Sequence, residues 1–274
     1  MRTEDPQAER YEGSVRDDAL RAQAQTGKTI TVRINRGEAG DRVGHWETFT
    51  VELFSGMVVL DAVLLVQAKQ APDMAVRWNC KAAKCGSCAA EVNGRPRLMC
   101  KTRVEDFDLA QPVLVQPMQT FPRIKDLVTD VSWNYRVNEK IVPFKPRTDR
   151  PWKFYQKDVE KAQEMRECIE CFLCQDVCHV LRYSDEDKPQ FFGPRFFVRS
   201  AGLDFHPMDA EDRVGQLRAE GGIGLCNITK CCTEVCPAGI HITDNAIIPE
   251  KERVVDAFDD PLRALFRPKN GKAE

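Results

Sequence analysis

Residues 80–88 read Cys-Lys-Ala-Ala-Lys-Cys-Gly-Ser-Cys, and a further cysteine follows at position 100. The spacing is therefore C-x4-C-x2-C-x11-C, and its first three cysteines match the loop that wraps a plant-type [2Fe–2S] cluster. Gly86 allows the backbone to approach a cluster closely, with N–H groups turned towards sulfur. Structural zinc usually combines two C-x2-C-like pairs, whereas this segment has one such pair. The spacing thus favours a [2Fe–2S] site formed by Cys80, Cys85, Cys88 and Cys100.

A second cysteine run, at 168–178, has the spacing C-x2-C-x2-C-x3-C of bacterial ferredoxins. In that pattern the first three cysteines hold one cluster, and the fourth, here Cys178, ligates a neighbouring cluster. A reciprocal run is therefore expected, and it lies at Cys226, Cys232 and Cys236-Pro237. Thr229 stands where the second cysteine of that run would be.

Thr229 makes the two predicted sites in this half of the chain unequal. One site receives four thiolates and is predicted to hold [4Fe–4S], with the ligands Cys168, Cys171, Cys174 and Cys236. The other receives three and is predicted to hold [3Fe–4S], with the ligands Cys178, Cys226 and Cys232. A cubane with three thiolate anchors tends to lack its fourth iron. Cys231 is the remaining cysteine, and we expect it to be a free thiol, because adjacent residues rarely ligate one cluster from one turn.

The composition limits the class of protein. A length of 274 residues suggests about two domains, and twelve cysteines are too few for a small disulfide scaffold. Forty basic and forty-two acidic residues leave a net charge of −2, which argues against binding nucleic acid through a basic surface. The charged N-terminus lacks a secretory signal, and the longest apolar stretch, 57–66, is too short for a bilayer. We therefore expect a soluble chain in a reducing compartment, where thiols are free to bind metal.

Hydrophobic patterning divides the chain into three parts. Residues 1–28 are predicted to be a charged arm, and residues 29–130 an α+β domain in which Asn93-Gly94 marks a hairpin turn. Residues 131–274 are predicted to be mainly helical and to carry the last two cysteine runs. The first domain is expected to have a helix over 57–70 and strands at 29–34, 48–53, 89–92, 97–99 and 113–115. The helices expected in the second domain lie at 156–180, 207–220 and 247–265.

No nucleophile, acid–base or nucleotide-binding motif accompanies the cysteines, so we expect electron transfer, with the substrate chemistry on a partner. Over about residues 28–266 the chain resembles the iron–sulfur subunit of the succinate dehydrogenase and fumarate reductase family. The resemblance rests on the order and spacing of eleven cysteines, including Cys-Gly-Ser-Cys at 85–88. It also rests on Phe121-Pro122-Arg123-Ile124-Lys125-Asp126-Leu127-Val128 and on Gly193-Pro194.

The resemblance implies a β-grasp ferredoxin-like domain followed by an α-helical ferredoxin domain. It also implies a subunit of a membrane-associated succinate:quinone oxidoreductase of the respiratory chain and tricarboxylic acid cycle. Electrons would run from the FAD of a dicarboxylate-oxidising partner through [2Fe–2S], [4Fe–4S] and [3Fe–4S] to a quinone. The chain would lie on the cytoplasmic face of the cell membrane as a peripheral subunit, held by partner and membrane-anchor subunits. The alternatives are a fumarate reductase, a related quinone- or thiol-linked oxidoreductase and a zinc-stabilised interaction module.

Three positions depart from the family pattern. The plant-type loop often carries glycine where this chain has Ala83, so a positive φ there would strain the loop. Many relatives follow the Cys178 position with Pro-Ser and tryptophans of a ubiquinone pocket, and the Cys226 position with His. This chain has His179 and Asn227 at those places. We take His179 and Asn227 as quinone-site candidates and menaquinone as the quinone that the changes suggest.

Three further groups suggest contact surfaces. An aromatic cluster is expected to place at least one ring against the membrane anchor, and its members are Phe191, Phe192, Phe196 and Phe197. A basic group is expected to face lipid headgroups, a partner or solvent, and comprises Arg182, Lys188, Arg195 and Arg199. A C-terminal helix is expected to cover the catalytic partner with Leu262, Leu265 and Phe266.

Overall fold

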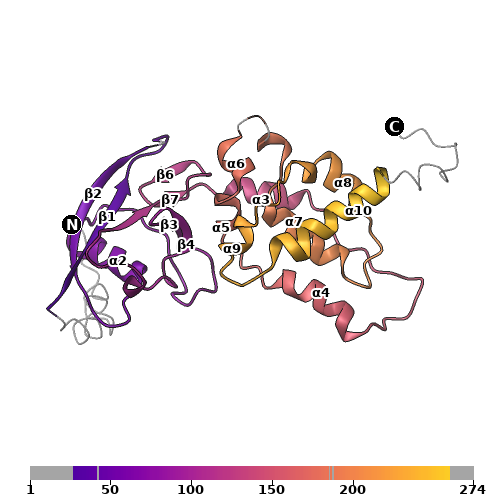
Figure 1. The fold of residues 1–274 in the computed structure, drawn as a ribbon, viewed down its shortest axis with the longest axis horizontal. Coiled ribbons are helices and arrows are strands. Elements are labelled where there is room, and N and C mark those ends of the chain that lie inside the picture. The colour runs from indigo at the N-terminus through magenta and orange to yellow at the C-terminus, as the bar shows by residue number, and fades with distance from the viewer. Residues whose placement is uncertain (1–26, 42, 185, 187, 260–274) are drawn as a thin grey trace, which may run out of the picture.

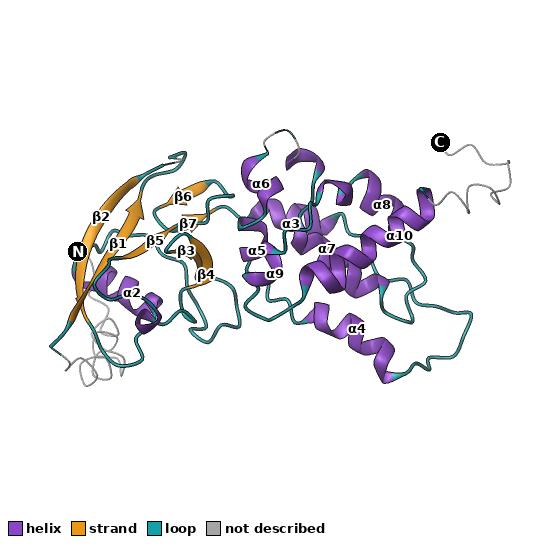
Figure 2. Ribbon diagram, in the orientation of Figure 1, coloured by secondary structure: helices purple, strands orange, loops and turns teal. Residues whose placement is uncertain are grey.

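The structure, a computed structural model, describes residues 27–41, 43–184, 186 and 188–259. The strands gather in one half of an elongated molecule together with helix α2 (Val59–Lys69), and the other helices occupy the second half (Figures 1 and 2). The predicted order, an α+β part followed by a helical part, is confirmed. The arm expected at 1–28 lies almost wholly outside the described residues, as do Leu262, Leu265 and Phe266.

The first half is built on a mixed five-stranded sheet with the order β2-β1-β5-β3-β4. The strands are β1 (Thr29–Arg36), β2 (His45–Glu52), β3 (Ala89–Val92), β4 (Arg95–Leu98) and β5 (Val113–Gln116). β1 pairs antiparallel with β2 and parallel with β5, while β3 and β4 form the hairpin predicted at Asn93-Gly94. Each of the five strands overlaps a predicted one, with boundaries that differ by up to three residues: β1 and β2 are expected from alternation, and β3 and β4 from the Asn93-Gly94 turn.

The core of this half lies between the sheet and α2. Ile30, Val32 and Ile34 alternate along β1 and are buried, as alternation on a half-covered strand requires. The buried face of α2 packs in the same cluster and consists of Val59, Leu60, Ala62, Val63 and Val66. A short hairpin closes the half, formed by β6 (Arg123–Lys125) and β7 (Val128–Thr129).

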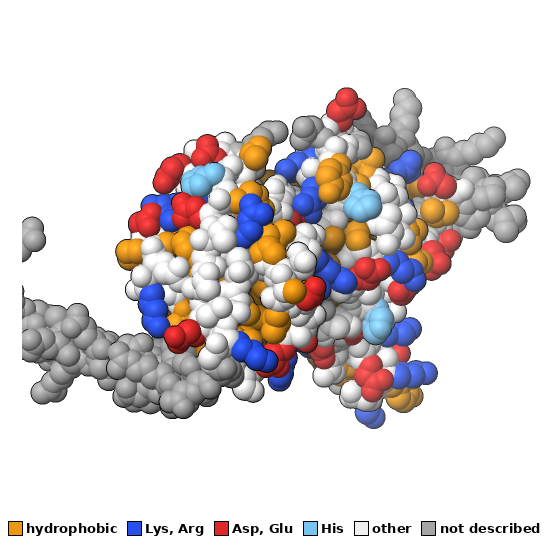
Figure 3. Space-filling view, turned by 60° about the vertical axis from the view of Figure 1, so that its left-hand side comes forward, with side chains coloured by type: hydrophobic (Ala, Val, Ile, Leu, Met, Phe, Trp, Pro, Cys, Tyr) orange, Lys and Arg blue, Asp and Glu red, His pale blue; other side chains and the backbone are white. Residues whose placement is uncertain are grey.

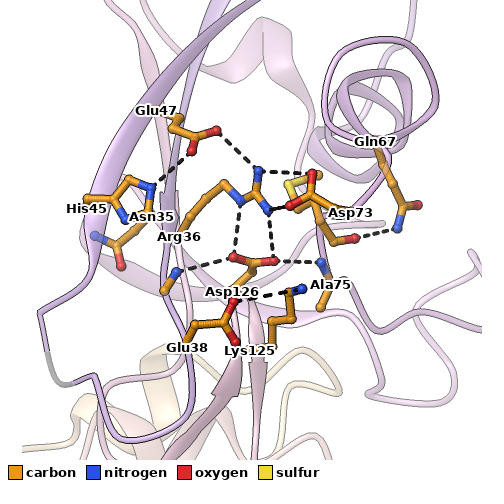
Figure 4. Close-up of polar contacts among 12 residues, drawn as sticks. Asn35, Arg36, Glu38, His45, Glu47, Gln67, Asp73, Ala75, Lys125 and Asp126 are labelled. Atoms are coloured by element: carbon orange, nitrogen blue, oxygen red, sulfur yellow. Dashed lines mark hydrogen bonds and ion pairs between the residues drawn. The ribbon is translucent and has the colours of Figure 1, made fainter.

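Arg36, at the end of β1, connects three segments of this half through its buried guanidinium (Figure 4). It donates to Asp73 at 2.5 Å, to Asp126 at 3.1 Å and to Glu47 at 3.3 Å. The other oxygen of Asp126 accepts the backbone N–H of Ala75 at 2.8 Å. The hydrogen bond to Asp73 contributes most to raising the pKa of Arg36. These bonds attach the β6–β7 hairpin, which leads to the second half, to the sheet.

The second half is helical and has its own buried cluster. Its helices are α3 (Ser132–Glu139), α4 (Gln156–Arg166), α5 (Leu173–Asp176), α6 (His179–Tyr183), α7 (Pro194–Asp204), α8 (Val214–Ala219), α9 (Cys231–Glu234) and α10 (Ile248–Phe258). A π-helical segment, Ile242–Ile247, leads directly into α10. Single turns of 3-10 helix occur at Val104–Asp106, Lys188–Gln190 and Ile223–Leu225.

The predicted helix boundaries in this half are only partly correct. The helix predicted over 156–180 is divided into α4, α5 and α6. Glu170 and Phe172 adopt positive φ in the cysteine loop between α4 and α5, and Cys178 is extended between α5 and α6. The helix predicted over 207–220 begins only at Val214, because the backbone before it pairs with an earlier segment: Arg147 N–H donates to the Met208 carbonyl at 3.0 Å and Ala210 N–H to the Lys145 carbonyl at 2.8 Å. Three helices of the described part, α3, α7 and the short α9, lie where the sequence pattern predicts none.

The aromatic cluster expected to dock on a membrane anchor is instead part of the core. Phe191, Phe192, Phe196 and Phe197 are at most 5% exposed. Their rings pack against one another because α7 turns both of its phenylalanines inward. Figure 3 shows acidic and basic side chains interspersed on one face of the molecule. Within the described ranges, no helix has the length and apolar character to cross a membrane.

Candidate iron–sulfur sites

The first cysteine group lies in the irregular loop before β3 and directly after β4. Backbone N–H groups of this loop point at its sulfur atoms: Ala82 and Lys84 donate to Cys80 Sγ at 3.3 Å, and Ala83 donates to Cys100 Sγ at 3.3 Å. Cys80 N–H and Cys100 N–H lie 3.5 Å from the sulfurs of Cys85 and Cys88. Donors arranged in this way stabilise negative charge on sulfur. The loop therefore fits a thiolate-bound, anionic cluster.

Positive backbone angles make this wrapping possible. Lys81, Ala83 and Gly86 have φ of 54°, 55° and 70°. Ala83 thus has the positive φ at which the absence of glycine strains the loop, and a non-glycine residue in this region carries a strain of about 1–2 kcal/mol. The positive φ turns the N–H of Ala83 towards Cys100 Sγ, so this hydrogen bond depends on the strained conformation.

Burial and hydrogen bonding shift the pKa values of two thiols in this loop. Desolvation raises the pKa of Cys88 to about 12. Desolvation also acts on Cys85, but hydrogen bonds from Ser87 and from the Cys80 backbone outweigh it and lower the pKa of Cys85 to about 7. A metal that binds Cys88 must displace a tightly held proton, and cluster binding is therefore coupled to proton release.

The second cysteine group surrounds an enclosed cavity at the start of α5. Cys168, Cys171, Cys174 and Cys236, the four predicted [4Fe–4S] ligands, line it together. Apolar side chains complete most of the wall, namely Ile169, Phe172, Val198, Ala238, Ile240 and Ile242. Burial, with the charges of Cys168 and Cys236, raises the pKa of Cys171 to about 12. A mostly apolar cavity lined by four cysteines suits a buried anionic cluster.

The third group is formed where the end of α5 meets α9. Burial raises the pKa of Cys178 to about 12 and that of Cys232 to about 11. Cys226 adds to the rise for Cys232, and Cys231 adds to the rise for both. Cys231 is half-buried rather than buried; its sulfur lies 3.2 Å from Thr229 Oγ1 and donates to the carbonyl of Val177 at 3.5 Å. Cys231 therefore lies beside the third group.

The two cysteine runs of the helical half are structural repeats. Glu170 and Phe172 adopt positive φ before α5, and Ile228 and Lys230 do so before α9. The second pair follows the first by 58 positions. The same offset relates Cys168 to Cys226, Cys171 to Thr229, Cys174 to Cys232 and Cys178 to Cys236. Cys231 then corresponds to Leu173, which is a buried core residue. The reciprocal cysteine run expected from the ferredoxin pattern is thus accompanied by a repeat of the backbone conformation.

The two halves meet at the first and second groups. Gly86 lies so close to Cys171 that a Cβ on Gly86 would be 2.7 Å from Cys171 Cα. Lys101 donates to the carbonyl of Pro237 at 2.8 Å, and Thr120 N–H donates to the buried carboxylate of Asp176 at 3.0 Å. The cysteine loops of the two domains are therefore in direct contact.

The residues named for other roles lie in different environments. His179 and Asn227 are exposed and directly follow cysteines of the third group, and the His179 ring packs edge-on against Tyr183 at 6.1 Å. Two of the arginines expected on a basic face are engaged within the molecule: Arg182 pairs with the buried Glu91 at 2.6 Å, and Arg195 is buried. Arg195 lines the cavity of the second group. The sequence carried no signal for this, because its acidic partner, Glu170, lies 25 positions away.

Two family models match the chain, one over each half. Residues 31–135 match a 2Fe-2S iron-sulfur cluster binding domain, and residues 164–240 match a 4Fe-4S dicluster domain. The first model covers the Cys80–Cys100 loop, and the second covers the two repeated cysteine runs. The matches agree with the β-grasp and helical ferredoxin folds expected from the sequence.

Three similar proteins are subunits of fumarate reductases or of an Sdh1 complex. The chain is 30% identical over 203 residues to the fumarate reductase iron-sulfur subunit of Mycobacterium tuberculosis, covering 71% of this chain and 80% of that protein. It is 32% identical over 227 residues to a fumarate reductase (CoM/CoB) subunit of Methanothermobacter marburgensis, covering 80% of this chain but only 43% of that protein. A chain of the Sdh1 complex of Mycobacterium smegmatis in the apo form superposes with a TM-score of 0.82 at 54% identity, covering 85% of this chain and 98% of that chain.

Proposed function

Because the chain belongs to the family of iron–sulfur subunits of succinate dehydrogenases and fumarate reductases, we propose that it conducts electrons between a partner's FAD and a quinone. The observation that carries the proposal is the grouping of eleven cysteines into three adjoining sites. Bound iron–sulfur clusters supply one-electron oxidation and reduction. The substrate, succinate or fumarate, would react on the flavin-bearing partner.

We assign the ligands as the cysteine spacing predicts them. Cys80, Cys85, Cys88 and Cys100 would hold [2Fe–2S], and the N–H groups directed at their sulfurs support this. The shared cavity supports [4Fe–4S] on Cys168, Cys171, Cys174 and Cys236. With these ligands, the contact between Gly86 and Cys171 would lie between the two clusters.

The third site would hold [3Fe–4S] on Cys178, Cys226 and Cys232. The backbone repeat supports this assignment, because it places Thr229 at the ligand position of Cys171. It also places Cys231 at the position of Leu173, which packs in the core. Cys231 is thus proposed to remain a free thiol, engaged with Thr229 and the Val177 carbonyl.

The quinone would bind beside the third site. His179 and Asn227 are the candidates of this chain, because both are exposed next to its cysteines. Menaquinone remains the proposed quinone, and a membrane-anchor subunit at the cytoplasmic face of the membrane would hold the assembly. A fumarate reductase with the same subunit is the second candidate function, favoured by the named fumarate reductase relatives.

Purification of the chain with its native partners tests the proposal. We expect iron and acid-labile sulfide for three clusters, a [3Fe–4S] EPR signal in the oxidised complex and a quinone in the organic extract. Cys232→Ser should abolish quinone reduction while succinate oxidation with an artificial acceptor is largely retained. Zinc in place of iron would instead support an interaction module. Equal loss of both activities, in a complex that still contains FAD, would contradict the proposed order of sites.

A further inference from the structure

Arg195 is a cation enclosed beside the second cysteine group. It is the second residue of α7, and its backbone N–H donates to the side chain of Gln175 at 3.2 Å. Its side chain is 3% exposed and lines the cavity with Cys168, Cys171, Cys174 and Cys236. The remaining walls of this cavity are apolar, so the guanidinium is a concentrated charge in a dry environment.

The hydrogen bonding of Arg195 is incomplete. Nη2 donates to the carboxylate of Glu170, whose side chain is 39% exposed. Nε and Nη1 are buried and have no hydrogen-bond partner among the described residues. Leaving two N–H groups of a buried cation unpaired is unfavourable. A negatively charged group in the cavity would compensate them.

We propose that Arg195 raises the reduction potential of the cluster held by Cys168, Cys171, Cys174 and Cys236, and that Glu170 moderates this effect. The inference rests on the ligand assignment in the proposed function. Reduction adds one negative charge to the cluster, and a neighbouring cation stabilises the reduced form more than the oxidised form. Glu170, placed between Cys168 and Cys171, partly neutralises the guanidinium and lowers its effect.

The charges of the pair predict opposite effects for its two members. Removing Arg195's charge should disfavour reduction, whereas removing Glu170's charge should favour it. A merely structural role of the pair would move both potentials in the same direction or leave both unchanged. Arg199, one turn further along α7, is exposed and provides a control on the same helix.

The test is an EPR-monitored redox titration of the intact complex carrying Arg195→Gln, Glu170→Gln, Arg195→Lys or Arg199→Gln. At a fixed potential, Arg195→Gln should lower the ratio of reduced to oxidised cluster by about tenfold, equivalent to about 59 mV for a one-electron couple. Glu170→Gln should raise that ratio several-fold. Arg195→Lys should stay within about threefold of wild type, and Arg199→Gln should not change it.

Equal potentials in wild type, Arg195→Gln and Glu170→Gln would overturn the inference, as would shifts of the same sign. If Arg195→Gln loses the cluster, the inference is tested by Glu170→Gln and Arg195→Lys. A reduction potential of Glu170→Gln at or below that of wild type would then contradict the inference. A wild-type complex without a [4Fe–4S] signal would instead refute the ligand assignment of the proposed function. The two failures are therefore distinguishable.

Discussion

Replacing Gly86 with alanine tests whether the contact between the two cysteine loops holds the domains together. The new Cβ would lie 2.7 Å from Cys171 Cα and 2.9 Å from Cys171 Cβ, whereas ordinary contact begins at 3.4 Å. One loop would have to move by about 0.7 Å. We expect neither loop to yield easily, because each contains positive-φ residues and each would be fixed by a cluster in the holoprotein. The change therefore strains the domain interface.

Two terms contribute to the expected loss of stability. Alanine at a φ of 70° costs about 1–2 kcal/mol, and overpacking against Cys171 adds about 1–3 kcal/mol. Gly94→Ala is a matched control, because Gly94 has a φ of 73° and a Cβ added there would have no atom within 4 Å. The excess of Gly86→Ala over Gly94→Ala should therefore be about 1–3 kcal/mol, or roughly 2–12 °C in Tm.

The assay is thermal unfolding of the holo-complex, followed by loss of visible absorbance, with EPR of the fully reduced sample. Gly86→Ala should also weaken the magnetic interaction between the two clusters on either side of the contact, because their loops move apart. Gly94→Ala should leave that interaction unchanged. Equal Tm values for the two variants, with unchanged magnetic interaction, would show that the Gly86–Cys171 contact does not set the domain spacing.

Three further predictions concern the helical half. Burial and the neighbouring Asp204 raise the pKa of Glu250 to about 8, so the free energy of unfolding should fall as pH rises from about 4.5 to about 8. In Glu250→Gln this fall, on the order of a few kcal/mol in total, should be absent. Parallel curves of Tm against pH for wild type and variant would contradict this prediction. Thr229→Cys should supply the missing thiolate and allow a fourth iron to bind, so that the oxidised [3Fe–4S] EPR signal disappears, and persistence of the signal at full intensity would count against the backbone repeat. Cys231→Ser should leave the [3Fe–4S] signal in place, because Cys231 corresponds to Leu173, and its loss would identify Cys231 as a ligand.

Local features of the chain follow from its sequence. The sheet strands and α2 agree with alternating and helical periodicity. The cysteine groups follow from spacing, since the geometry of a ligand loop is set within a few residues. The donated Cys178 and Cys236 are predictable because the ferredoxin pattern itself prescribes an exchange of ligands.

The hydrophobic pattern fails to predict secondary structure and burial where contacts with distant residues determine the conformation. The predicted helix 156–180 ignores the cysteine loop, in which Glu170 and Phe172 take positive φ to direct sulfurs inward. The phenylalanines around Gly193 are predicted in part at the surface, and only the packing of α7 shows that they are core. A hydrophobic residue looks the same in a core as in a docking patch until the covering elements are known.

The sequence by itself predicted an α+β part followed by a helical part, the three cysteine runs and the missing cysteine at Thr229, because each of these is read from residues close together in the chain. Tertiary structure alone decided the contact of Gly86 with Cys171 and the burial of Arg195 against the second cavity. Both depend on segments brought together by packing, 85 positions apart in one case and 25 from Arg195 to Glu170 in the other. Distance and dielectric environment, which govern electron transfer and reduction potential, are properties of that packing and not of the spacing of cysteines.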